Sequence, residues 1–145
     1  MKLSVLDFIN TYAKFHSSMV YIPERKSFNL AISDDDRPGI YFILNGEDIL
    51  KIGKADGKNG LKGRIKSYKS NLSSRRQDPT VARIYQAMTG VLKNQELSLY
   101  LLPLPPIRQQ IMGYWLDLQM ARSLEYQLST QAKHEQHSML LSGQD

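Results

Sequence analysis

The chain has 145 residues, the usual size of one compact domain and too few for two ordinary ones. Hydrophobic residues make up 41% and charged residues 23%, a globular balance that argues against wholesale disorder. The absence of Cys excludes disulfides, Cys-ligated zinc and thiol nucleophiles, and the three His residues are too few for a His-rich metal site. No apolar run reaches the roughly 18 residues of a membrane-spanning helix, and the N-terminus lacks the layout of a secretory signal, so we expect a cytoplasmic protein.

Positive charge is concentrated in one stretch of the sequence. The formal net charge of the chain is +5, whereas residues 54–83 contain nine basic and two acidic side chains, a net +7. Such a localised positive block is expected of a protein that binds the phosphate backbone of nucleic acid. On charge alone, a solvated basic helix face explains the block equally well.

The N-terminal third combines a helix pattern with a hairpin pattern. Ser4 to Asp7 fits a capping box, and apolar residues then recur at helical spacing, which predicts an amphipathic helix over residues 4–19. A polar turn over residues 34–39 separates this N-terminal extension from the rest of the chain. The apolar runs 40–44 and 49–52 are joined by turn-forming residues and predict two antiparallel strands.

The remaining elements alternate between helix and strand. A glycine-containing loop leads to a helix on which Leu61, Ile65 and Tyr68 share one face, and which carries much of the basic block. Asp78-Pro79 is typical of a helix start and predicts a second helix over residues 79–89. Residues 96–102 predict a third strand, which three prolines end.

The C-terminal region shows a long helical pattern from residue 107 to about 135, interrupted near Gly113, and then a frayed tail. The whole pattern predicts an α+β fold with a small three-stranded antiparallel sheet flanked by helices. Its expected divisions are an N-terminal helical extension, a core and a C-terminal tail: 1–36, 37–135 and 136–145.

Three short motifs carry the chemistry of the sequence. Gly39-Ile40-Tyr41 lies on the first predicted strand, Lys51-Ile52-Gly53 on the second, and Gly63-Arg64-Ile65 on the helix after the hairpin. This order resembles the GIY-YIG nuclease module, in which a hairpin and an Arg-bearing helix precede a helix with a catalytic Glu. The resemblance covers about residues 38–130, and the ordered combination is far more specific than any one tripeptide.

The resemblance implies a catalytic set made of Tyr41, Lys51, Arg64 and Glu125, with DNA as the substrate. Lys51 stands where the family name has its second Tyr, as in GIY-YIG restriction enzymes that use Lys there. The sequence also lacks the Asn that many members place after the Glu, and Gln131, His134 or nothing takes its place.

These residue types suit the hydrolysis of a phosphodiester bond. Glu125 is expected to hold one Mg²⁺ or Mn²⁺ ion, and Arg64 to bind a phosphate oxygen. Tyr41 or Lys51 is then the general base, and the like charges of Lys54 and Arg64 would lower the pKa of the Lys51 amine. The residues expected to contact DNA are the basic side chains of the block and one tyrosine: Lys54, Lys58, Lys62, Lys66, Tyr68, Lys69, Arg75 and Arg76.

Other interpretations stay open at this point. Taken singly, Tyr41 is more often a packing residue, and Glu125 on a helix can pair with Arg122. A GIY-YIG-like module that binds nucleic acid without cutting it would explain the replaced Tyr and the missing Asn. A protein-binding module that uses the N-terminal helix is disfavoured by the +7 block. An enzyme that cuts palindromes would need a homodimer, whereas a repair or homing nuclease could act as a monomer.

Overall fold

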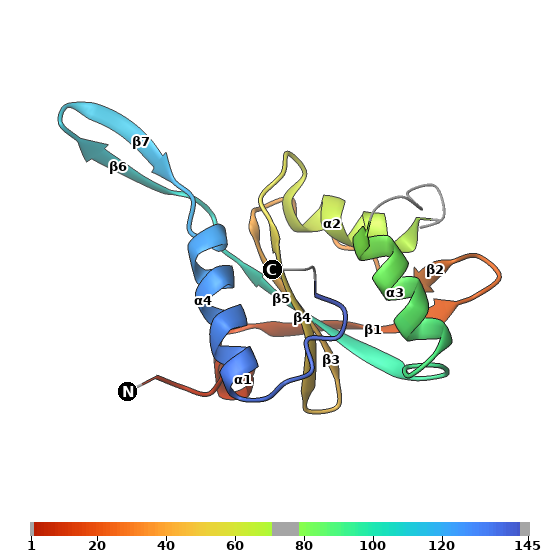
Figure 1. Ribbon diagram of the computed structural model, residues 1–145. Coiled ribbons are helices and arrows are strands. Elements are labelled where there is room, and N and C mark those ends of the chain that lie inside the picture. The colour runs from red at the N-terminus through yellow and green to blue at the C-terminus, as the bar shows by residue number, and fades with distance from the viewer. Residues whose placement is uncertain (1, 71–78, 143–145) are drawn as a thin grey trace.

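The computed structural model describes residues 2–70 and 79–142, and it has an α+β fold, as the sequence predicts (Figure 1). Within this part of the chain, no helix is long and apolar enough to cross a membrane. The helices and strands occur in the order α1 (Val5–Tyr12), β1 (Lys14–Ile22), β2 (Ser27–Asn29), β3 (Gly39–Asn45), β4 (Asp48–Ala55), α2 (Gly60–Lys69), α3 (Pro79–Thr89), β5 (Glu96–Pro103), β6 (Ile107–Ile111), β7 (Tyr114–Leu118) and α4 (Ala121–His134).

The main sheet is antiparallel and larger than the three strands that the sequence predicts. Its order is β2-β1-β5-β3-β4, so the three predicted strands β5, β3 and β4 are neighbours, and β1 and β2 extend the sheet beyond β5. Both added strands lie within residues 1–36, for which the sequence pattern predicts only a helical extension. The division of the chain at residues 36 and 135 stays a prediction.

The predicted helix over residues 4–19 is wrong in its second half. Ser4 caps α1 as expected, because its hydroxyl accepts a hydrogen bond from the Asp7 N–H at 3.1 Å. However, α1 ends at Tyr12, and β1 begins two residues later. β1 contains the strand-favouring residues Phe15, Val20, Tyr21 and Ile22. A register shift between Phe15 and Ser17 puts Phe15 opposite Tyr100 and Met19 opposite Leu97, on different faces of the sheet, so the spacing of Phe15 and Met19 does not indicate the strand.

The predicted long helix over residues 107–135 is also wrong in its first half. Residues 107–118 form the β6–β7 hairpin, and α4 begins only at Ala121. Met112 and Gly113 join the two strands, with φ values of 51° and 81°. Two central residues with positive φ are the mark of the tight turn that suits a twisted hairpin. The four-residue spacing of Ile107 and Ile111 is compatible with both a helix and a strand.

The segment after α4 is not a frayed tail in residues 136–142. Met139 N–H donates to the Ile49 carbonyl at 3.0 Å, and Leu141 N–H donates to the Leu50 carbonyl at 2.9 Å. The Leu141 side chain is fully buried. This segment therefore covers part of β4, which is an edge strand of the main sheet. Residues 143–145 lie outside the described residues.

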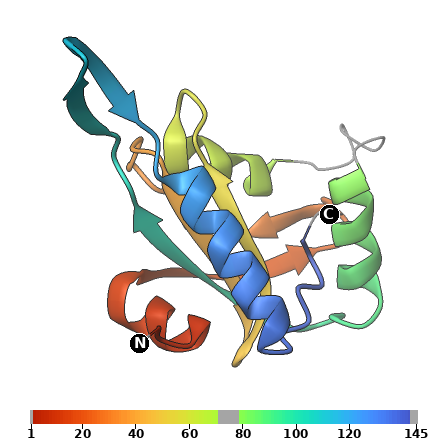
Figure 2. The same cartoon turned by 60° about the vertical axis from the view of Figure 1, so that its left-hand side comes forward.

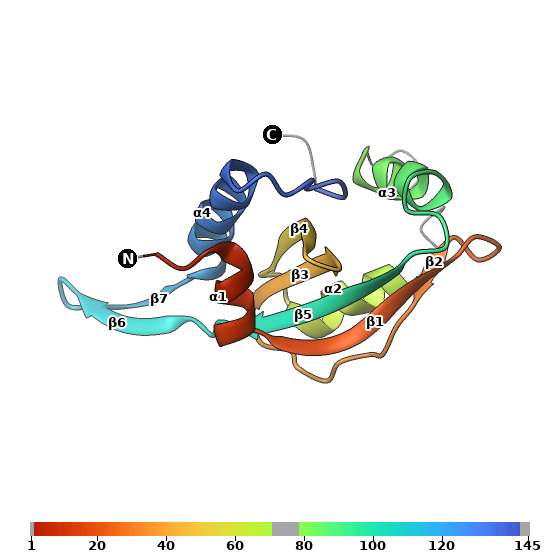
Figure 3. The same cartoon turned by 90° about the horizontal axis from the view of Figure 1, so that it is seen from below.

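Both faces of the sheet are covered by helices (Figures 2 and 3). Alternate residues of β3 divide between two hydrophobic clusters, as a strand buried on both faces requires. Tyr41 and Ile43 pack with α2 and α3, whereas Ile40 and Phe42 pack with α1 and α4. All of these side chains are almost completely buried. The β3–β4 hairpin is therefore held between two layers of helix.

The polar turn before β3 fixes the start of α2. Leu61 N–H donates to the Arg37 carbonyl at 3.0 Å, and Lys62 N–H donates to the Asp35 carbonyl at 2.7 Å. These carbonyls satisfy N–H groups that the first turn of a helix leaves without partners. Gly60 has a φ of +55°, and a Cβ there would collide with the Arg37 carbonyl. The turn thus sets the position of α2 relative to β3.

Candidate active site

Tyr41 lies at the centre of the candidate site and is 3% exposed. Its partner across the β3–β4 ladder is Gly53. A Cβ at position 53 would collide with the Tyr41 ring and hydroxyl. The glycine of Lys51-Ile52-Gly53 is therefore required by packing, because the Tyr41 side chain occupies the space that any larger residue would fill.

The Tyr41 side chain is tied to α2. Its hydroxyl and that of Tyr68 are 3.1 Å apart and hydrogen-bonded, with either one as donor. The two rings meet edge to face, with centroids 5.8 Å apart. Tyr68 is buried with Leu61 and Ile65 on the inner side of α2. Arg64, one turn before Tyr68, is exposed on the same helix.

The charges of Arg64 and Glu125 both act on the Tyr41 phenol. Burial is the largest influence and raises its pKa, because the ionised ring would lose its hydration. The hydrogen bond with Tyr68 and the positive charge of Arg64 lower the pKa, and the negative charge of Glu125 raises it. Three of the four expected site residues, from β3, α2 and α4, are therefore close enough to interact.

Lys51 lies on the same face of the hairpin as Tyr41. It pairs with Ile43 across the β3–β4 ladder, two residues before Gly53 on β4. Directly opposed residues of an antiparallel pair share a face, and Ile43 lies on the same face of β3 as Tyr41. Lys51 therefore lies on the face of the hairpin that carries Tyr41. The side chain is half-buried.

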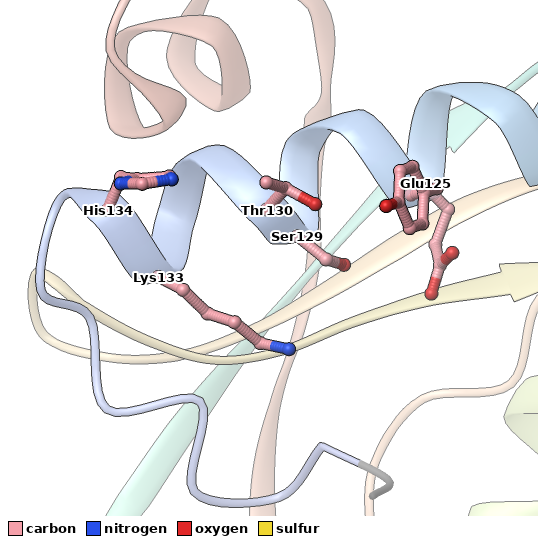
Figure 4. A pocket seen from close by; sticks show the side chains of 6 residues that line it. Glu125, Ser129, Thr130, Lys133 and His134 are labelled. Atoms are coloured by element: carbon pink, nitrogen blue, oxygen red, sulfur yellow. The ribbon is translucent and has the colours of Figure 1, made fainter. Parts of the chain in front are cut away.

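Glu125 lies in the second turn of α4 and lines a cavity of about 580 Å³. Glu125, Ser129 and Lys133 are spaced four residues apart and project from one side of the helix, toward the β3–β4 hairpin (Figure 4). Three further residues complete the lining: Tyr126, Thr130 and His134. A carboxylate, two aliphatic hydroxyls, a phenol, an amine and an imidazole thus border one open space.

Ser129 and Lys133 are residues that the sequence interpretation missed. Their signal is the i+4 and i+8 spacing from Glu125, which becomes useful only when the helix is placed against β4. Of the two residues considered as substitutes for the missing Asn, His134 lines the cavity. The Gln131 amide instead donates to the Leu3 carbonyl at 2.7 Å and to Glu135 at 2.8 Å.

The residues expected to contact DNA differ in how accessible they are. Lys58, Lys62 and Lys66 are exposed, and Lys54 is half-buried. The Lys69 amine donates to the Leu30 carbonyl at 2.7 Å, so it also ties α2 to the segment after β2. Tyr68 is buried against Tyr41. Arg75 and Arg76 lie outside the described residues.

Glu125 is the one carboxylate that lines this cavity. The part of the chain that the structure describes contains no group of three or more His, Asp and Glu that could hold a metal ion. A lone carboxylate beside a Ser hydroxyl fits Mg²⁺ or Mn²⁺, hard cations that accept oxygen ligands, and Mg²⁺ keeps several of its own waters. It does not fit a structural zinc site, which needs four protein ligands.

The close approach of Tyr41 to Gly53 gives a direct test. Gly53→Ala should lower the free energy of unfolding by about 1–3 kcal/mol, because the added methyl must displace the Tyr41 ring. Gly57→Ala is the matched control, since a Cβ there meets nothing within 4 Å. Urea denaturation of the two variants would measure the difference. Equal stabilities would contradict the placement of Tyr41 over Gly53.

Two solved structures of nucleases have folds similar to that of this chain. No protein-family model and no curated protein matches the sequence. Among solved structures, restriction endonuclease HPY188I in complex with product DNA is similar, with a TM-score of 0.57, 14% identity and coverage of 89% of this chain and 76% of that one. A mutant of EndoII from bacteriophage T4 is similar with a TM-score of 0.58, 14% identity and coverage of 94% and 97%. The protein therefore shares its fold with these two structures.

Proposed function

We propose that this protein is a DNA endonuclease of the GIY-YIG type that hydrolyses phosphodiester bonds with the help of one divalent cation. The observation that carries the proposal is the convergence of Arg64 and Glu125 on the buried Tyr41 phenol, from three separate elements. A fold shared with two nucleases supports it. Tyr41, Arg64 and Glu125 are far apart in the sequence, and packing alone does not require them to lie near one another.

Arg64 and Glu125 have complementary roles in this proposal. The Arg64 guanidinium is exposed on α2, so its planar donors can bind a non-bridging phosphate oxygen. Glu125 would hold a Mg²⁺ or Mn²⁺ ion, which would stabilise negative charge on the phosphoryl and leaving oxygens. The two residues thus place positive charge on two sides of the phosphate that is cut.

Lys51 is the general base that we propose. Burial raises the pKa of Tyr41 above its ordinary value, so the phenol keeps its proton at neutral pH and acts as a donor. A base must instead accept a proton from water, and a neutral amine can do so. Lys51 lies on the same face of the hairpin as Tyr41 and is more exposed than it, so we assign the base to its amine.

The DNA backbone would lie between α2 and α4. On α2, the exposed Lys62 and Lys66 present cations beside Arg64. On α4, Ser129 and Lys133 continue the line that begins at Glu125. Eight residues of helix span about 12 Å, so Lys133 would meet a phosphate other than the one that is cut.

The first prediction from the proposed function concerns Glu125. Glu125→Gln should abolish the cleavage of supercoiled plasmid in Mg²⁺ and leave DNA binding largely intact, because the amide keeps the shape of the side chain and loses its charge. Glu96→Gln, an exposed carboxylate at the start of β5, should cut normally. A wild-type protein that binds plasmid but never cuts it, with Mg²⁺ or with Mn²⁺, would favour the non-catalytic binding module.

The second prediction concerns the base. Turnover at saturating DNA should rise with pH as the Lys51 amine loses its proton, and Lys51→Ala should lose both the activity and this pH dependence. Lys93→Ala, an exposed lysine in the turn before β5, should keep the pH dependence. If Lys51→Ala weakened binding and left the pH profile unchanged, the base would be Tyr41.

The third prediction concerns the binding face. DNA affinity should fall steeply with salt, and reversing the charges of Lys62 and Lys66 together should reduce the log–log slope by roughly 0.9 for each lost phosphate contact. The control reverses Lys14 on β1 and Lys93 in the turn before β5, which are both exposed. Equal slopes for the two double variants would show that DNA binds to a surface other than α2.

A further inference from the structure

The β6–β7 hairpin projects away from the rest of the molecule (Figures 1 and 3). Its strands form a separate two-stranded sheet in the part of the chain that the structure describes. Large apolar side chains are exposed along it, including Met112 at 90%, Tyr114 at 73% and Trp115 at 60%. An isolated two-stranded hairpin is at best marginally stable in water, so this one needs a partner.

The two faces of the hairpin have different compositions. Residues that oppose each other across the two strands share a face, and successive residues alternate between faces. One face is almost entirely apolar and carries no charge: Ile107, Gln109, Ile111, Tyr114, Leu116 and Leu118. The other, polar face carries Arg108, Gln110 and Asp117 together with Trp115, and the Arg108 guanidinium lies over the Trp115 ring, 5.4 Å from its centroid.

The charge distribution argues against a nucleic-acid partner for the apolar face. Phosphate binding needs cations, and this face has none. The hairpin as a whole is neutral, because Arg108 and Asp117 are cross-strand partners on the polar face. A strongly charged protein surface would leave its own charges without partners on such a face.

The same distribution favours a second copy of the chain. In a two-fold interface each patch meets itself, so a charged patch would bring like charges together, and an uncharged apolar patch does not. We propose that the apolar face of the β6–β7 hairpin packs against the same face of a second copy and makes the protein a homodimer. Each copy then covers the apolar face of the other, including the exposed Ile107, Tyr114 and Leu116.

The position of the hairpin links this dimer to the candidate site. Two residues separate β7 from α4, and Glu125 lies in the second turn of that helix. Dimerisation through the hairpin would therefore hold the two α4 helices, and the two Glu125 cavities, in a fixed relation. The self-association itself does not depend on the proposed nuclease function, so it can be tested without DNA or metal.

Two variants on opposite faces of the hairpin test the proposal. Leu116 and Gln110 are both exposed, and changing either one to Glu adds one negative charge per chain. Leu116→Glu should raise the dimer dissociation constant by roughly a hundredfold or more, because each dimer would bury two of these charges in place of two leucines. Gln110→Glu should leave the dimer intact. Sedimentation velocity over a concentration series measures both.

Unfolding midpoints show whether a variant loses the dimer only because its monomer is less stable. Both variants should melt like the wild type at low concentration, where all are monomeric, because neither side chain is buried in the monomer. The proposal is overturned if the wild type is monomeric throughout, or if Gln110→Glu dissociates the dimer as strongly as Leu116→Glu. A monomer in which Leu116→Glu weakens DNA binding would show that the hairpin is instead a nucleic-acid arm.

Discussion

The contact between the Tyr41 ring and the backbone of Gly53 is the constraint on which the candidate site depends. A side chain at position 53 would occupy the space of the Tyr41 ring, and the phenol could not then reach the hydroxyl of Tyr68. This hydrogen bond joins the β3–β4 hairpin to α2, the helix that carries Arg64. The missing Cβ at position 53 thus helps to set the position of Arg64 relative to the sheet, together with the turn that binds the start of α2.

The edge position of β4 completes the site. α2 and α4 belong to opposite layers, and their residues enter different hydrophobic clusters. Helices on opposite faces of a wide sheet could not bring charges to one phenol. Because β4 is an edge strand, α4 can pack against it and bring Glu125 within electrostatic reach of Tyr41. The segment after α4 then covers part of the same edge through Met139 and Leu141.

The sequence predicts the centre of the fold well and its margins poorly. The β3–β4 hairpin, α2, α3 and β5 are found where local patterns place them, since apolar runs and turn residues agree there. Phe15 with Met19 mislead because a register shift in β1 puts them on different faces of the sheet. Ile107 with Ile111 mislead because a four-residue spacing suits a helix and a strand equally. Which of the two forms is decided by partners distant in sequence, and a local pattern does not contain them.

The site shows the same limit. Motif order is enough to single out Tyr41, Arg64 and Glu125, and in the structure the charges of Arg64 and Glu125 act on the Tyr41 phenol. Ser129 and Lys133 escape a motif search because their importance depends on which side of α4 faces β4. The roles of these residues in cleavage stay proposals.

The central claim is that Arg64 and Glu125 both act on Tyr41 from separate helices. An NMR titration of the Tyr41 ring carbon bonded to the hydroxyl tests it most directly. The pKa of Tyr41 should exceed its ordinary value in the wild type, fall in Glu125→Gln, where a negative charge is removed, and rise in Arg64→Gln, where a positive charge is removed. A Tyr41 pKa that neither substitution changes would contradict the convergence of α2 and α4 on this residue.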